Sequence, residues 1–393
     1  MNKRLAVRAI TVLASGAVGV AVASAAPAAY AATHAPGPAT AGGAVFVQTN
    51  GLDHNSVVAY TRGANGHLTR VGETRTGGEG GVERDVPLDS LASQDSLTYD
   101  AAHHLLIAVN AGSNTLTTFA VDGAHLLRLQ TVPSGGVFPV SVSAGHGRLF
   151  VLNAGGTGNV TGYRINPAGR LSALPGGSRD LGLNNDPRPE FITAPADITQ
   201  TPDGQHVVVT TKANNDIDVF NVSDAGLSAP VRNTAAAGVP FAASFDAQHR
   251  LAIANAGDSS LSTYTVNADG TLDTITAGVQ DGQAALCWLV GTGDTFFGGN
   301  AGSSTISAFA VDASGNAALT GTPDGVVAHT GGGSGGTIDL AISGDKQFLY
   351  AENSFAGSVE AYQIQSDHTL QLVDTQIGLP QFNGHGMEGL VAL

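Results

Sequence analysis

Six ionisable side chains of this sequence are of the types that bind an anion or move a proton. Arginine and lysine can hold a carboxylate or a phosphate, and the candidates for substrate binding are Arg84, Arg188 and Lys212. Glutamate and histidine can exchange a proton with a reacting group, and the candidates for catalysis are Glu190, Glu352 and His385. The loops predicted to lie near these six residues carry further polar side chains that could take part: Glu83, Asp85, Gln94, Asp95, Asp258, Glu388 and His54. Solvated loops carry charges in any protein, so a purely structural role for each residue stays open.

Other chemical motifs give weaker signals. Gly332-Gly333-Ser334-Gly335-Gly336 has the Gly-x-Ser-x-Gly pattern of a nucleophile, but a strand rather than a helix is expected to follow it. The same glycine run lacks the lysine that a phosphate-binding loop needs. The twelve histidines include no His-x-His or His-x₃-His spacing, so no metal site and no cofactor are predicted. The single Cys287 lies in the apolar stretch Ala285–Leu289, where we expect a structural thiol.

The elements that must position these residues form an internal repeat. Seven segments place an aliphatic residue three positions before an aromatic one, and the aromatic residues are Tyr60, Phe119, Tyr163, Phe220, Tyr264, Phe309 and Tyr362. Their spacings are 59, 44, 57, 44, 45 and 53 residues. A period of about 40–50 residues is typical of four-stranded propeller blades.

Each repeat contains four predicted strands separated by tight turns. An apolar strand that ends in Asn precedes a turn such as Ala111-Gly112-Ser113-Asn114, and the aromatic strand follows that turn. A second turn such as Asp122-Gly123 leads into a further strand. Because Asn recurs in nearly every repeat, at Asn110, Asn153, Asn255, Asn300 and Asn353, we interpret it as a turn-forming residue and not as a ligand contact.

The two ends of the chain predict how the ring closes. The first repeat begins at Ala44 with its second strand, and the segment Met387–Leu393 resembles the missing inner strand. We therefore predict an all-β fold over residues 44–393, a seven-bladed β-propeller of four-stranded blades closed by the C-terminal strand joining the first blade. Turns after second strands and connections between blades share one face, here called the top, and insertions at 77–94, 180–194 and 325–336 fall there.

The N-terminus and the charge predict location and exclude some partners. Lys3, Arg4 and Arg8 precede an apolar stretch, and Ala29-Tyr30-Ala31 fits a signal peptidase site, so residues 1–31 are predicted to be a signal peptide of a secreted, extracellular protein. Residues 32–43 are predicted to be a flexible lead-in. Cleavage removes three of the 17 basic residues and none of the 32 acidic ones, which leaves a formal charge of −18. Nucleic acid and anionic membranes are therefore disfavoured as partners, and we expect a monomer.

The strand-Asn-Ala-Gly-Ser-Asn-Thr-strand units and the Pro202-Asp203-Gly204 turn resemble the lactonase-type propeller family, which includes 6-phosphogluconolactonase-like and carboxymuconate-cyclising proteins. The resemblance covers about residues 44–393. It implies opening or closing of a lactone at the mouth of the central channel, with Arg and His binding the substrate. The family's Pro-Arg-His pattern is absent here, since the corresponding entries read Phe138-Pro139-Val140, Pro195-Ala196-Asp197 and Val239-Pro240-Phe241.

Two hypotheses follow. The first is a secreted lactone hydrolase or cyclase that uses acid–base chemistry at the top mouth. The second is a non-catalytic propeller that binds a small molecule, a glycan or a protein through its top loops. Convergence of an arginine, a carboxylate and a histidine at the mouth would favour catalysis.

Overall fold

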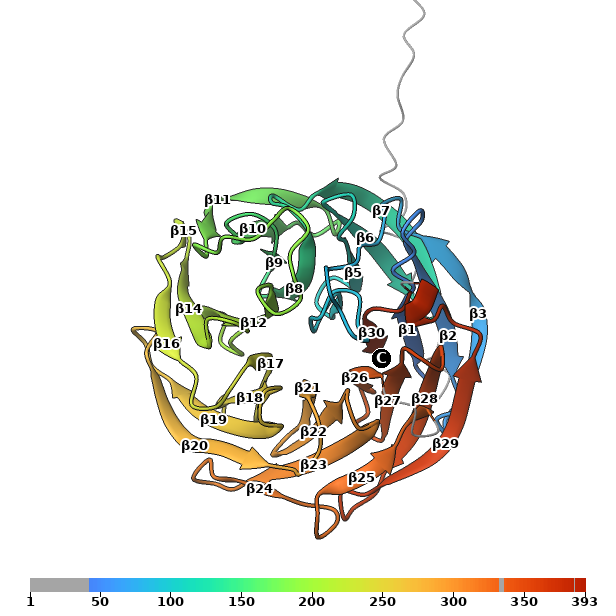
Figure 1. Ribbon diagram of the computed structural model, residues 1–393. Helices are drawn as coiled ribbons and strands as arrows, with labels where there is room; N and C mark the ends of the chain where they lie inside the picture. The colour runs from blue at the N-terminus through green and yellow to red at the C-terminus, as the bar shows by residue number, and fades with distance from the viewer. Residues whose placement is uncertain (1–41, 332–335, 385) are drawn as a thin grey trace, which may run out of the picture. The chain divides into compact units, whose positions relative to one another are not determined.

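Seven antiparallel sheets form a ring in this computed structural model, which describes residues 42–331, 336–384 and 386–393 (Figure 1). The predicted signal peptide and nearly all of the predicted lead-in, as well as His385, lie outside the described residues. Among the described residues, no helix is long and apolar enough to cross a membrane.

The first three blades follow the chain order from the closing strand. Blade 1 contains β30 (Leu390–Ala392), β1 (Ala44–Gln48), β2 (Ser56–Arg62) and β3 (Leu68–Arg75). Blade 2 contains β4 (Leu97–Asp100), β5 (Leu105–Asn110), β6 (Thr115–Asp122) and β7 (His125–Pro133). Blade 3 contains β8 (Pro139–Gly145), β9 (Arg148–Asn153), β10 (Asn159–Ile165) and β11 (Leu171–Asp180).

The next two blades include one with a divided outer strand. Blade 4 contains β12 (Pro195–Gln200), β13 (His206–Thr211), β14 (Asp216–Ser223), β15 (Gly226–Leu227) and β16 (Val231–Thr234). Blade 5 contains β17 (Pro240–Phe245), β18 (Leu251–Asn255), β19 (Ser260–Val266) and β20 (Leu272–Gln280).

The last two blades complete the ring. Blade 6 contains β21 (Leu286–Thr292), β22 (Thr295–Asn300), β23 (Thr305–Val311), β24 (Ala317–Leu319) and β25 (Val326–His329). Blade 7 contains β26 (Thr337–Ile342), β27 (Phe348–Asn353), β28 (Ser358–Ile364) and β29 (Leu370–Ile377). The 3₁₀ helix η2 (Phe382–Gly384) lies in the connection from β29 to β30.

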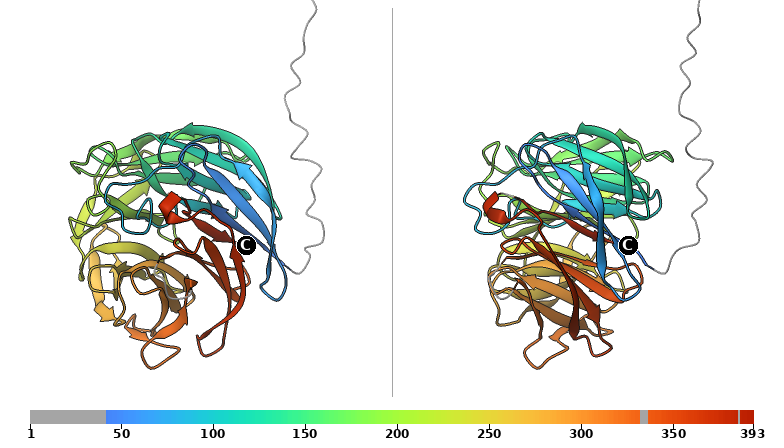
Figure 2. Two further views of the ribbon diagram at one scale, coloured as in Figure 1. Left: turned by 45° about the vertical axis from the view of Figure 1, so that its right-hand side comes forward. Right: turned by 90° about the vertical axis from the view of Figure 1, so that its right-hand side faces the viewer.

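The C-terminal strand closes the ring as the sequence predicted. Val45, Phe46 and Val47 of β1 pair with Ala392, Val391 and Leu390 of β30. Two views from the side place the C-terminus beside the blue first blade (Figure 2). The Asp339 carboxylate of β26 accepts a hydrogen bond from the Leu390 amide at 2.7 Å, so the closing strand is also tied to blade 7.

The aromatic residues of the repeat form the core between blades. All seven are buried, and they lie on the third strand of each blade. The recurring asparagines are also buried, and Asn110, Asn255 and Asn300 donate to hydroxyl groups on the neighbouring strand of their own blade. Their predicted structural role is therefore confirmed.

One expected insertion is shorter than predicted. Val326–His329 pairs with β23 as the second half of an outer strand, so the top loop of this blade begins only after His329. This strand is short and directly follows Pro323-Asp324-Gly325, a sequence that indicates a turn or loop.

We predict that ring closure depends on the apolar side chain of Leu390. Leu390→Ala should lower the free energy of unfolding by about 2–4 kcal/mol, because the truncation leaves a cavity at the junction. The control Ile377→Ala removes an aliphatic side chain that is 77% exposed and should change stability by less than about 0.5 kcal/mol. Denaturant unfolding measures both, and equal effects would contradict this role for β30.

Candidate functional site

The connection from β3 to β4 turns inward, into the ring (Figure 1). We call residues 89–95 the plug. The Ser93 hydroxyl donates to the Val140 carbonyl at 2.9 Å, and the backbone N–H of Gln94 donates to the Ala196 carbonyl at 3.0 Å. Gln94 Oε1 also accepts the Leu289 amide at 2.8 Å. The plug is therefore fastened to the inner strands β8, β12 and β21 of three different blades.

A cluster of buried carboxyl groups surrounds the start of the plug. Asp89 Oδ1 and Glu388 Oε2 both accept the Leu91 amide N–H at 3.2 Å. Because both carboxyl groups accept the same amide N–H, two negative charges would lie side by side, which favours a proton on one of the two groups. Burial raises the pKa of Asp89 and raises that of Glu388 well above its ordinary value, and for Glu388 the nearby Asp89 charge adds to the rise.

Two further glutamates belong to this cluster. The side chains of Glu83 and Glu352 are fully buried, and none of their carboxyl oxygens has a hydrogen-bond partner among the residues that the structure describes. Burial raises the pKa of both groups well above the ordinary value, and Asp339 and Asp89 raise that of Glu352 further. Such groups favour the neutral form in the interior.

Lys212 is the basic group that acts on these acids. Its Nζ donates to the Ala92 carbonyl of the plug at 2.7 Å and lies 5.3 Å from the centre of the Phe241 ring. Burial lowers the pKa of Lys212, while the charges of Glu83 and Asp89 oppose that decrease. Ala92 itself has a φ of 44°, a left-handed conformation that is costly for a residue with a Cβ. The lysine contact offsets part of that cost.

An apolar pocket of about 250 Å³ opens beside the plug, between blades 4, 5 and 6. Its walls come from the plug region, from the connection before β12 and from the entries of β17 and β21; they include Leu88, Phe191, Ile192, Val239, Phe241 and Trp288. Asp89, Lys212 and Cys287 supply the functional groups of its lining. The ring centres of Phe241 and Trp288 are 5.3 Å apart in an edge-to-face arrangement, which fixes the shape of the wall.

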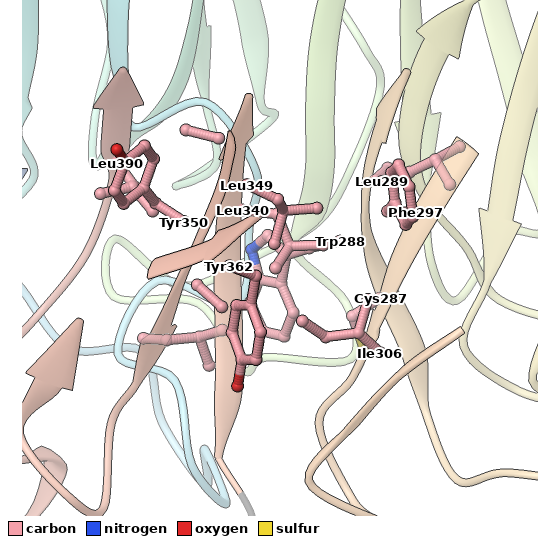
Figure 3. Packing of buried hydrophobic residues seen from close by; sticks show 14 of the residues in the cluster. Cys287, Trp288, Leu289, Phe297, Ile306, Leu340, Leu349, Tyr350, Tyr362 and Leu390 are labelled. Atoms are coloured by element: carbon pink, nitrogen blue, oxygen red, sulfur yellow. The ribbon is translucent and has the colours of Figure 1, made fainter. Parts of the chain in front are cut away.

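The neighbourhood of Cys287 and Trp288 is part of the largest apolar cluster. Figure 3 shows both side chains with Leu340, Leu349 and Tyr362 among the packed residues. Burial raises the pKa of the Cys287 thiol, so the reactive thiolate is disfavoured. The Trp288 Nε1–H donates to the Ser93 carbonyl at 3.0 Å, so the tryptophan is held against the plug.

Three predicted site residues meet on the top face and join two loops. Arg84 forms ion pairs with Asp186 at 2.8 Å and with Glu190 at 3.3 Å. Arg188 donates from its guanidinium to the carbonyl oxygens of Val82 and Glu83. Their partners come from the chain itself, so these groups fasten the β3–β4 connection to the β11–β12 connection.

The other predicted residues lie in the interior or cannot be placed. Lys212 lines the pocket and Glu352 belongs to the buried carboxyl cluster, whereas His385 lies outside the described residues. The sequence analysis missed Asp89, Phe241 and Trp288. The signal that could have pointed to them is the only tryptophan of the chain, which stands at the entry of an inner strand.

Comparisons with known proteins agree with this architecture. Residues 171–290 match the protein family described as Lactonase, 7-bladed beta-propeller. No curated protein sequence matches the chain.

Solved structures resemble the ring over most of its length. A proposed 6-phosphogluconolactonase of Bacteroides fragilis superposes with a TM-score of 0.67 at 16% identity, covering 90% of this chain and 99% of that one. The periplasmic gluconolactonase PpgL of Pseudomonas aeruginosa gives a TM-score of 0.66 at 16% identity, covering 86% and 97%. A protein from Lactobacillus plantarum gives 0.67 at 17% identity, covering 89% and 98%. At these identities the likeness establishes the fold.

The buried carboxyl groups predict an unusual dependence of stability on pH. Because their folded pKa values are raised, the native state binds more protons than the unfolded state above about pH 4, and stability falls as pH rises. Burial raises the pKa of Asp95 to about 7, so the loss of stability that this group causes continues to neutral pH. The thermal midpoint should therefore be higher near pH 5 than near pH 7.5, with a difference of several degrees.

Asp89→Asn should reduce that difference, since it removes one carboxyl group whose pKa is raised by burial. The control Asp122→Asn removes the same charge from an exposed hairpin turn and should leave the difference unchanged. Scanning calorimetry at the two pH values tests this, and a flat profile for the unmodified protein would rule out the buried protons.

Proposed function

We propose that this chain belongs to the lactonase family of seven-bladed propellers and acts as a hydrolase. Its substrate is a small, uncharged and largely apolar lactone, which binds in the pocket beside the plug. The observation that carries the proposal is the combination of an apolar, aromatic wall with Lys212 and Asp89 in one lining. Apolar pockets with a few polar groups at one side are typical of small-molecule sites.

The size and the charge of the pocket support this substrate class. A dry cavity of about 150 Å³ holds a benzene molecule, so about 250 Å³ accommodates a lactone ring with a short alkyl chain. The arginines that would hold a carboxylate or phosphate, Arg84 and Arg188, are engaged in joining the top loops. An anionic lactone would therefore find no free guanidinium group here, and the charge of Lys212 is already opposed by the nearby Glu83 and Asp89.

Lys212 and the Asp89–Glu388 pair supply the chemistry. The ionised member of the carboxyl pair takes a proton from a water molecule whose oxygen bonds to the lactone carbonyl carbon. The Lys212 ammonium stabilises the negative charge that develops on the carbonyl oxygen. The ring C–O bond then breaks, the protonated carboxyl group gives its proton to the leaving oxygen, and a hydroxy acid is the product.

A second candidate function is binding of the same kind of ligand without turnover. It is supported by the apolar character of the site and by the absence of arginine and histidine from its lining over the described part of the chain. For either function we propose that the protein acts after export, following the signal peptide predicted at residues 1–31.

The hydrolase proposal predicts turnover of alkyl-substituted γ- and δ-lactones by residues 32–393 in a pH-stat assay. Lys212→Met should lower kcat by about 100-fold or more, as for the loss of one oxyanion contact, and Asp89→Asn should also lower it. The matched control Lys346→Met changes an exposed lysine on the opposite face and should leave kcat unchanged. Equal activity of Lys212→Met and Lys346→Met would refute the assignment.

The unique tryptophan provides a direct measurement of pocket occupancy. Since Trp288 is the only tryptophan of the chain and lines the pocket, a bound lactone should change its emission in a saturable way. Carboxylated lactones should leave the emission unchanged. A saturable change with no acid release would favour the binding function, whereas no change with any lactone would rule out both functions for this pocket.

A further inference from the structure

A second cavity lies on the top face, outside the plug and the apolar pocket. This groove of about 660 Å³ is located between the outer parts of blades 1 and 2. Its lining combines the turn between β1 and β2, the end of β3, the turn between β5 and β6, and one residue of β7. We call it the Arg75–Arg128 groove after its two basic side chains.

The two arginines have no partner in the described part of the chain. Neither Arg75 nor Arg128 forms an ion pair or a side-chain hydrogen bond with any residue that the structure describes. Other arginines are fastened to carboxylates, as Arg62 is to Asp345 and Arg250 to Asp246. In a chain with 32 acidic residues, two unpaired guanidinium groups in one groove favour an anionic ligand.

The backbone around the groove is built to hold Arg128 in place. Gly77 has a φ of 85°, and a Cβ on this residue would overlap the Arg128 guanidinium. The hydroxyl groups of Thr117 and Thr131 both donate to the Thr76 carbonyl at 3.0 Å, which fixes the chain just before the glycine. The guanidinium therefore lies against a backbone segment with a defined position.

The groove also presents acceptors that require a hydrogen-bond donor. Asn55 is buried, and its Nδ2 donates to Val109 and to Asn110, so the orientation of the amide is determined. Its Oδ1 is likewise buried and is not exposed to the groove. The carboxylates of Asp53 and Glu79 line the same groove. Hydroxyl groups satisfy acceptors of this kind.

We infer that the Arg75–Arg128 groove binds a carboxylate that carries several hydroxyl groups, of the uronic-acid kind. The ligand carboxylate accepts from the two guanidinium groups, and the ligand hydroxyl groups donate to the carboxylates of Asp53 and Glu79. Such a unit occurs as a free sugar acid and within acidic polysaccharides. The site is separate from the Trp288 pocket and does not depend on the proposed hydrolysis.

Isothermal titration with the full propeller tests the inference. D-glucuronate should bind, whereas glucose, which lacks the charge, and propionate, which lacks the hydroxyl groups, should each bind at least about tenfold more weakly. A uronate trisaccharide that binds more tightly than glucuronate would assign the ligand to a polysaccharide, and equal affinity would assign it to the free sugar acid.

Variants on the groove provide the decisive comparison. The double variant Arg75→Gln/Arg128→Gln should lose at least about tenfold in affinity for glucuronate, and Gly77→Ala should weaken binding by displacing Arg128. The matched control Arg70→Gln alters another exposed arginine of β3, which pairs with Glu73, and should bind normally. Unchanged affinity in the double variant, or propionate binding as tightly as glucuronate, would overturn the inference.

Discussion

A polypeptide segment that enters the interior of a propeller must find a hydrogen-bond partner for each of its polar groups. The plug meets this requirement through the inner strands, whose upper ends offer amide and carbonyl groups toward the channel. Ser93 bonds to blade 3, Gln94 to blades 4 and 6, and Leu91 to the glutamate that precedes the closing strand. Lys212 and Trp288 in turn bond to the plug, so their positions depend on these contacts.

The same burial that fixes the plug creates the chemistry next to it. Carboxyl groups held away from water retain protons at a pH where exposed ones have lost them, and a buried ammonium group is correspondingly easier to deprotonate. Asp89 and Glu388 come from segments almost 300 residues apart, and only the closed ring brings them together. The polar end of the pocket is therefore a product of ring closure as much as of local sequence.

The sequence predicted the ring well because each blade repeats one apolar pattern, and the aromatic residues such as Tyr60 and Phe309 mark its third strand in every copy. It predicted the site less well, because the site is made by an insertion that occurs once. Arg84 and Glu190 were both predicted to lie on top loops, but nothing in their spacing shows that they pair with each other. The direction of the Asp89 segment, inward rather than over the surface, depends on long-range bonds that no local pattern contains.

Pairing of β1 with β30 joins residues from the two ends of the described chain. Without β30, the first blade keeps an open edge formed by β1, which is buried in the closed ring and is apolar except for Gln48. Folding to the native ring thus requires β30, and contacts of such large sequence separation form slowly. A ribosome that stalls before Leu390, or a protease that removes β30, would release a chain with an unpaired strand edge and a strong tendency to self-associate.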